Sequence, residues 1–435
     1  MEVSDKICQE IRGFIDEFQK DGFRSPNLYD KFYEIVRDEA KIYAFCDEFL
    51  RRIPNGATIF NDALSYLNLK DFASLIKTAV EILQAEFSAA NAQKRQCEFN
   101  ENAEEVIAKA SLECEWLLHP YLEQIYKLKP NEGTYYENYP WRNLSFENAQ
   151  IYRDMLVFGG ADAGKLFECL VATGDERNVK FAYEYALAND IFEKKDGAAE
   201  YLAWYLQDFG FTLECGQIKS YYSNSVSHII FPKGYFTAQR PIWLRKDLHP
   251  TWNLPAGNER YKFGGVLEDD ENDPLCHIIT FEGLPAGLGV TGLRSLTLGA
   301  HLNQINEGGL CFYRHDEQGY PHLIGERARI SCTVDKPIAP CEVSLAVTPK
   351  RWQKQDWGMA NGRENLFRIG GEPCWIQSAD VPTCPVSGKK MRFLMQLDSE
   401  LGCTDGGEML FGSGGICYVF WCDESKTSAF FMQCT

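Results

Sequence analysis

The fold is decided by the stretch Lys262-Phe263-Gly264-Gly265, because its pattern returns later in the chain as Arg368-Ile369-Gly370-Gly371. A second matching pair follows, Gly308-Gly309-Leu310-Cys311-Phe312 and Gly414-Gly415-Ile416-Cys417-Tyr418. In both copies the two Gly-Gly pairs lie 44 residues apart (308 minus 264, and 414 minus 370). The sequence therefore predicts one β-rich unit that is present twice, so that each copy can bury an edge and a face of the other.

Glycine and proline mark where this β-rich part begins. Residues 1–200 contain 9 Gly and 5 Pro, whereas residues 201–435 contain 26 and 13. Helices avoid both residue types and turns need them. We expect an α+β protein with an all-helical, solenoid-like domain over residues 1–221. An internally duplicated antiparallel-sheet domain should follow over residues 222–435, with copy one at about 222–340 and copy two at about 341–435.

The helical prediction rests on apolar residues at helical spacing in the first half. One such face is Ile7, Ile11, Phe14, Ile15 and Phe18, and another is Phe72, Ile76, Val80, Leu83 and Phe87. After residue 222 the pattern changes to short apolar runs followed by Gly, Pro or acidic residues, which is typical of strands.

Composition indicates a folded protein without a membrane segment. The 435 residues are 45% hydrophobic, and no stretch is long and apolar enough to span a bilayer. The first residues contain no basic region leading into an apolar run, so we expect a cytoplasmic protein whose 16 cysteines are mostly reduced.

The formal charge of −18 argues against a nucleic-acid partner and favours a basic protein partner. Residues 1–200 hold 36 acidic and 23 basic residues, a net charge of −13. A solvated helical surface would also explain this imbalance.

Three candidate chemical sites have simpler structural explanations. Gly159-Gly160-Ala161-Asp162-Ala163-Gly164-Lys165-Leu166 is close to a phosphate-binding loop, but Leu166 stands where a Ser or Thr must bind Mg²⁺. The cysteines after residue 370 include no Cys-x-x-Cys pair, and Cys417 and Cys422 should face opposite sides of a strand. No Gly-x-Ser-x-Gly motif indicates a nucleophilic triad. We therefore expect no catalytic site, cofactor or metal from these motifs.

Histidines supply the main alternative. Six of the seven lie in the first β copy or just before it: His228, His249, His277, His301, His315 and His322. Their spacing matches no known ligand motif, but a metal-assisted hydrolase using His277 or His315 stays open as an alternative.

The second copy resembles the YwqG-like bacterial family. The resemblance begins at Ile369-Gly370-Gly371-Glu372-Pro373-Cys374-Trp375-Ile376-Gln377 and continues through Lys390–Ser399 and Phe411–Phe420. That family looks related to the programmed-cell-death-protein-two family of chaperones for a ribosomal protein, and its bacterial members are suspected of neutralising toxins. Some members carry Cys-Pro-x-Cys-Gly where this chain has Cys384-Pro385-Val386-Ser387-Gly388, so one cysteine is missing.

The resemblance implies binding residues in the second copy, and we select Trp375, Gln377, Gln396, Asp398 and Tyr418. Trp375 should pack in the core. A glutamine among apolar strand residues must either bond internally or face a ligand, and both interpretations stay open for Gln377 and Gln396.

Resemblance, charge and motifs together predict a binding protein rather than an enzyme. We expect an immunity protein or dedicated chaperone that holds a basic partner such as a toxin. A purely structural scaffold is the third interpretation.

Overall fold

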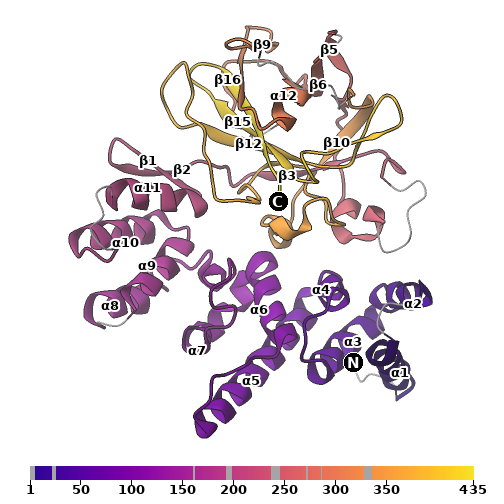
Figure 1. Cartoon of the computed structure of the whole chain (residues 1–435), viewed down its shortest axis with the longest axis vertical. Helices are drawn as coiled ribbons and strands as arrows, with labels where there is room; N and C mark the ends of the chain where they lie inside the picture. Colours follow the sequence, from indigo (N-terminus) through magenta and orange to yellow (C-terminus); the bar gives the residue numbers. More distant parts are fainter. Residues whose placement is uncertain are drawn as a thin grey trace. The chain divides into compact units, whose positions relative to one another are not determined.

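The computed structural model describes residues 5–21, 26–159, 162–192, 198–236, 245–270, 273–285, 287–327 and 336–435. The chain forms two compact units, Met1–Lys195 and Asp196–Thr435. Helices make up the first unit and a multi-stranded sheet dominates the second (Figure 1). The predicted α+β class, with a helical N-terminal part and a β-rich C-terminal part, is confirmed.

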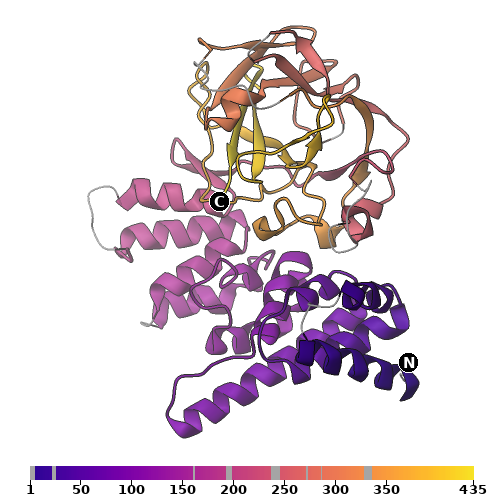
Figure 2. The ribbon, with the colours of Figure 1, turned by 45° about the vertical axis from the view of Figure 1, so that its right-hand side comes forward.

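Amphipathic helices build the first unit, and they follow one another in chain order (Figure 2). The predicted face of the longest helix is buried at Phe72, Ile76, Val80 and Leu83. Helices adjacent in sequence pack together as in a helical array, for example α8 on α9 and α9 on α10. No helix among the described residues is long and apolar enough to cross a membrane. The helices are α1 (Asp5–Asp21), α2 (Pro26–Val36), α3 (Glu39–Arg52), α4 (Thr58–Leu64), α5 (Leu69–Gln93), α6 (Glu101–Glu113), α7 (Leu122–Leu128), α8 (Gln150–Phe158), α9 (Ala163–Ala172) and α10 (Glu176–Ala188).

The near-match to a phosphate-binding loop joins two of these helices. Its preceding apolar run belongs to α8 and is not a strand, and Lys165 is buried with its ammonium 2.5 Å from Glu137. Gly160 and Ala161 lie outside the described residues. The described part of this segment is therefore a turn between two helices, and not the strand, loop and helix of a phosphate-binding loop.

The second unit opens with α11 (Ala198–Asp208) and a hairpin of β1 (Phe211–Glu214) and β2 (Gln217–Ser220). Within the described residues, one antiparallel sheet of 12 strands follows in the order β5-β6-β4-β10-β3-β11-β12-β15-β16-β8-β9, and β7 also pairs with β6. Its strands are β3 (Val226–Ile230), β4 (Tyr261–Phe263), β5 (Val266–Glu268), β6 (Leu275–Phe281), β7 (Leu296–His301), β8 (Cys311–His315), β9 (Pro321–Leu323), β10 (Cys341–Val347), β11 (Arg368–Gly370), β12 (Arg392–Asp398), β15 (Ile416–Cys422) and β16 (Thr427–Gln433). A short helix, α12 (Leu302–Asn306), and a small hairpin of β13 (Leu401–Gly402) and β14 (Glu408–Met409) complete the unit.

Strand pairing shows the duplication that the first Gly-Gly pair predicts. Phe263 of β4 pairs with Ile279 of β6, and Ile369 of β11 pairs with Met395 of β12. Both β6 and β12 carry a register shift immediately before these partners, where β7 and β15 respectively run along their other side. A shared bulge at matching positions is a specific feature of a fold rather than a general property of sheets.

The two copies exchange their first strands. β10 of copy two pairs with β4 of copy one, and β3 of copy one pairs with β11 of copy two. Cys341 and Ser227 take equivalent places in these two pairings. Three residues further on, Ser344 and Ile230 pair with each other. An approximate two-fold axis therefore passes through the Ile230–Ser344 pair.

The first Gly-Gly pair marks a close approach of two backbones in each copy. Gly264 and Gly370 have φ values of +75° and +66°. A side chain at Gly264 would collide with the carbonyl oxygen of Ala339, and one at Gly370 with that of Ser225. Ala339 and Ser225 are equivalent, because they lie two residues before Cys341 and Ser227. Only glycine combines this conformation with so close a neighbour.

The second pair of glycine motifs does not mark equivalent strands, and this part of the prediction is wrong. β12 pairs with β15, but its counterpart β6 pairs with β7 and not with β8. The β8–β9 hairpin instead pairs with β16 and extends the sheet. The two copies thus have the same arrangement in β4, β6 and β7 as in β11, β12 and β15. They differ after these strands, where the β8–β9 hairpin of copy one pairs with the edge strand β16 of copy two.

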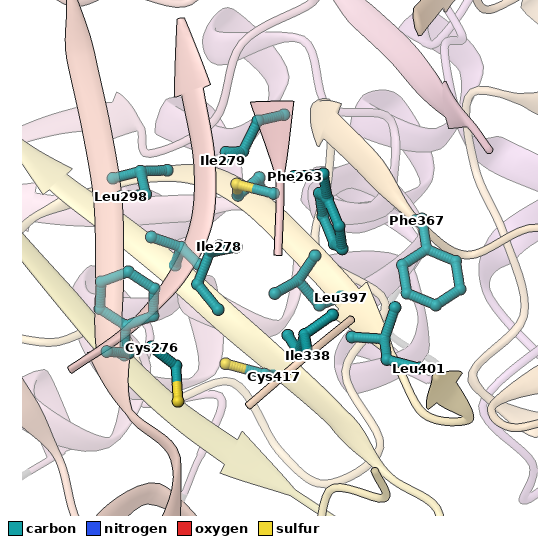
Figure 3. Close-up of a cluster of buried hydrophobic side chains, with 14 of the residues drawn as sticks. Phe263, Cys276, Ile278, Ile279, Leu298, Ile338, Phe367, Leu397, Leu401 and Cys417 are labelled. Carbon is teal, nitrogen blue, oxygen red and sulfur yellow. The ribbon is translucent and has the colours of Figure 1, made fainter. Parts of the chain in front are cut away.

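Hydrophobic clusters lie on both faces of the sheet. The larger cluster includes Phe263, Ile279, Leu298 and Leu397, drawn from both copies (Figure 3). A second cluster covers the opposite face, mainly over strands of copy two, and also includes Tyr221. β15 is buried along its whole length, with Cys417 in the larger cluster and Cys422 in the second, as the alternation of a strand predicts.

Candidate functional site

We call the face of the sheet opposite the larger hydrophobic cluster its outer face. In copy two, a segment of the chain itself covers this face. This segment follows β11, and its buried residues Cys374, Ile376, Val381 and Cys384 pack against Tyr418 and other strand residues. The predicted binding residues mostly lie at this seam, so their contacts show what the family motif does in this chain.

Gln396 and Tyr418 hold the backbone of the covering segment. The Gln396 carbonyl oxygen accepts from the Cys374 amide at 3.0 Å, and its amide donates to the Leu366 carbonyl at 2.9 Å. The Tyr418 hydroxyl accepts from the Ile376 amide at 3.1 Å and donates to the Cys374 carbonyl at 2.7 Å. Both side chains are fully buried. The internal interpretation of Gln396 is therefore the one that its contacts support.

Gln377 and Trp375 extend the same seam toward the surface. The backbone amide of Gln377 donates to the side-chain oxygen of Gln433 at 3.0 Å. The exposed side chain of Gln377 donates to the Cys434 carbonyl at 2.9 Å. The Trp375 indole is half-buried, lies 4.7 Å from the Tyr418 ring between centroids, and donates to the Tyr221 hydroxyl at 3.0 Å. Four of the five predicted residues thus meet in one place, where they fasten the chain to its own sheet.

Asp398 belongs to a separate buried cluster of charges. One of its oxygens accepts from the backbone amides of Asn361 and Ser399, both at 2.8 Å. The other lies 3.7 Å from the Lys246 ammonium, which is 3.3 Å from Glu400. Burial raises the pKa of Asp398 to about 6, although Lys246 and the two amides act in the opposite direction. Lys246 is not predictable from the sequence around it, because nothing there indicates that a lysine would be only 1% exposed.

Each of the six histidines of copy one has its own hydrogen-bond partners. Their partners are Thr348 for His228, Thr251 for His249, Gly264 and Thr280 for His277, Tyr313 for His301, Gly319 and Ser428 for His315, and Asp316 for His322. Burial lowers the pKa of His315 to about 4. Among the described residues, no three His, Cys, Asp or Glu side chains gather into a group that could hold a metal. The described structure does not assemble the ligand set that the hydrolase alternative needs.

The outer face of copy one differs from that of copy two. Pairing places Thr280 at the position of Gln396 and Thr297 at that of Tyr418, and the two threonines are themselves cross-strand partners. They are the partly exposed residues of two otherwise buried strands, β6 and β7. Polar side chains that stay partly exposed on a buried sheet are candidates for ligand contact.

Two hollows flank Arg260 near this face. One, of about 490 Å³, is lined by Ile230–Pro232 of copy one and by Cys341, Glu342 and Ser344 of copy two, so it lies at the junction of the copies. The other, of about 360 Å³, is lined by Glu259, Tyr261 and Glu282–Pro285. The charged residues that line the two hollows are three glutamates and one arginine.

Comparison with known proteins gives a partial bacterial relative. A protein of Salmonella typhimurium (strain LT2), described as uncharacterized protein YpfL, is 38% identical over 178 residues, which are 38% of this chain and 40% of that protein. The chain thus spans less than half of that relative's length. No model of a known protein family matches, and no solved structure matches. The similarity supports a bacterial protein, and the more specific resemblance to the YwqG-like family stays a prediction.

Proposed function

We propose that this chain is a cytoplasmic binding protein of the YwqG-like type that holds a basic protein partner. Its role would be that of an immunity protein that neutralises a toxin, or of a dedicated chaperone. The observation that carries the proposal is the way copy two holds Cys374–Gln377. Side chains of the sheet bind main-chain groups there, which is a chemistry that suits polypeptide ligands in general.

Charge supports the basic nature of the partner. The first compact unit, Met1–Lys195, holds 34 acidic and 23 basic residues, a net charge of −11 out of the total of −18. Such a field speeds the encounter with a cationic protein and is screened by salt.

The test is affinity purification of the tagged chain from its native bacterium at low and at high ionic strength. We expect a stoichiometric basic protein at low salt that dissociates as salt rises. Recovery of no stoichiometric protein, or of one whose binding does not change with salt, would contradict the proposal.

A further inference from the structure

In copy one, the part of the chain that corresponds to the covering segment of copy two is shorter. In copy two, 24 positions separate Gly371 from Met395 of β12 (395 minus 371). In copy one, only 14 positions separate the equivalent residues, Gly265 and Ile279 of β6 (279 minus 265). Copy two is thus ten positions longer in the stretch that contains Cys374–Gln377. Consistent with this, Lys262, Glu282 and Glu342 are exposed in copy one, whereas Arg368 and Asp398, the counterparts of Lys262 and Glu282, are buried.

A chain of hydrogen bonds fixes what the copy-one face offers to a ligand. His277 Nδ1 lies 2.7 Å from the Gly264 carbonyl, which can only accept, so this nitrogen carries the proton. Burial lowers the pKa of His277, so the ring is neutral and Nε2 accepts from the Thr280 hydroxyl at 2.8 Å. Thr280 then accepts from the Thr297 hydroxyl at 3.1 Å. Both hydroxyl protons are used, and the face presents oxygen acceptors.

Copy two shows how such acceptors are used. At the positions of Thr280 and Thr297, Gln396 and Tyr418 accept from the main-chain amides of the covering segment. The acceptors of copy one suit the N–H groups of an extended polypeptide that crosses the sheet at the same positions. Because threonine is shorter than glutamine or tyrosine, that polypeptide must lie closer to the sheet than Cys374–Gln377 does. Three glutamates and Arg260 line the two neighbouring hollows, and the Lys262 ammonium lies 3.3 Å from Glu282 on the face itself. The remaining excess of glutamate favours basic side chains on that polypeptide.

We propose that the copy-one face, formed by Thr280 and Thr297 and flanked by Glu282 and Glu342, binds an extended segment of the basic partner. The segment crosses the sheet at the positions equivalent to those that Cys374–Gln377 crosses on copy two, lies closer to the strands, and donates main-chain amides to the threonine oxygens. This placement rests on the proposed function and names the surface that performs it.

The test uses the full chain and a set of short fluorescein-labelled peptides in which lysine alternates with valine, leucine or phenylalanine. Fluorescence polarisation should detect binding to the wild type, and Thr297→Val should weaken it about five- to tenfold because one acceptor is lost. Thr297→Ser retains the hydroxyl and should bind like the wild type. Thr404→Val, at an exposed threonine of copy two, is the matched control and should have no effect.

Two outcomes overturn the placement. One is that the wild type binds none of the peptides, and the other is that folded Thr297→Val binds as tightly as the wild type. A basic partner that co-purifies equally with wild type and Thr297→Val would retain the proposed function and remove this face as its site.

Discussion

Two glutamines of the second copy carry the same side chain in different surroundings. Gln396 is fully buried and bonds through both ends of its amide, whereas the Gln377 side chain is exposed and makes one bond. A buried group that loses its partner costs more than a surface group, because water cannot replace the lost bond.

Replacing each glutamine by leucine should separate these two situations. We expect Gln396→Leu to lower the free energy of unfolding by about 2–5 kcal/mol, because the Cys374 amide and the Leu366 carbonyl both lose their partner. Gln377→Leu should cost less than about 1 kcal/mol. Urea denaturation measures both, and equal losses in the two variants would contradict the structural role of Gln396.

The raised pKa of Asp398 predicts that the stability of the protein depends on pH. Its pKa in the folded protein, about 6, exceeds its ordinary value of 3.8, so the folded state binds this proton more tightly than the unfolded state. The resulting stabilisation is complete below the ordinary pKa and is lost as pH rises through the folded pKa. The wild type should therefore lose on the order of 2–3 kcal/mol relative to Asp398→Asn between about pH 4 and pH 7.

Urea denaturation of both proteins across this pH range checks that expectation. Asp405→Asn, which changes an exposed carboxylate, is the control. A stability difference between wild type and Asp398→Asn that stays constant with pH would show that the burial beside Lys246 and Glu400 does not act as described.

At the scale of elements, the sequence predicts the features that have a local signal, which are the strand ends marked by glycine and the helices marked by apolar spacing. Gly264 and Gly370 reveal equivalent strand ends, since their backbone geometry admits no other residue. The exchange of β3 and β10 has no local signal, because the Ile230–Ser344 pair joins residues more than a hundred positions apart. Lys246 was missed for the same reason, since its burial is decided by Asp398 and Glu400 in a distant strand and turn.

Two turns of the second copy face each other with matching composition. Cys384-x-x-Ser387 lies at the end of the covering segment, and Cys422-x-x-Ser425 joins β15 to β16. The Cys384 sulfur lies 3.1 Å from the Ser425 hydroxyl, and the Ser387 hydroxyl lies 3.2 Å from the Cys422 sulfur. The two contacts hold the turns together, and two short turns that each carry two thiols are the usual frame of a structural zinc site.

Converting both serines to cysteine should create such a site. We expect Ser387→Cys with Ser425→Cys to bind one equivalent of Zn²⁺, because four thiolates on two short turns match tetrahedral coordination, and to gain thermal stability on binding. Zinc titration followed by thermal unfolding measures both effects. Cys215→Ser in the same background removes an exposed thiol and should leave binding unchanged. Failure of the folded double variant to bind zinc would show that the turns do not converge.

At the scale of the whole molecule, the compact units place the start of the β unit before the predicted boundary at residue 221. The second unit begins at Asp196 and includes α11 and the β1–β2 hairpin. Gln207 at the end of α11 accepts from the Val381 amide at 3.1 Å, and the Tyr221 carbonyl accepts from the Phe393 amide at 2.7 Å. The helical pattern of α11 conceals these contacts, because a sequence shows that a helix ends but not where it docks.

The fragment 196–435 should therefore fold on its own and be more stable than the fragment 222–435. The shorter fragment lacks Tyr221, which is buried and whose hydroxyl accepts from the Trp375 indole, and it leaves the amides of Val381 and Phe393 without partners. Losing a buried aromatic residue and these bonds should cost at least about 3 kcal/mol. Urea denaturation of both fragments, with fragment 1–195 as a helical reference, measures the difference. Because Trp375 packs against Tyr418, the shorter fragment should also lose order first in the covering segment, and equal unfolding midpoints would place the boundary at residue 221 instead.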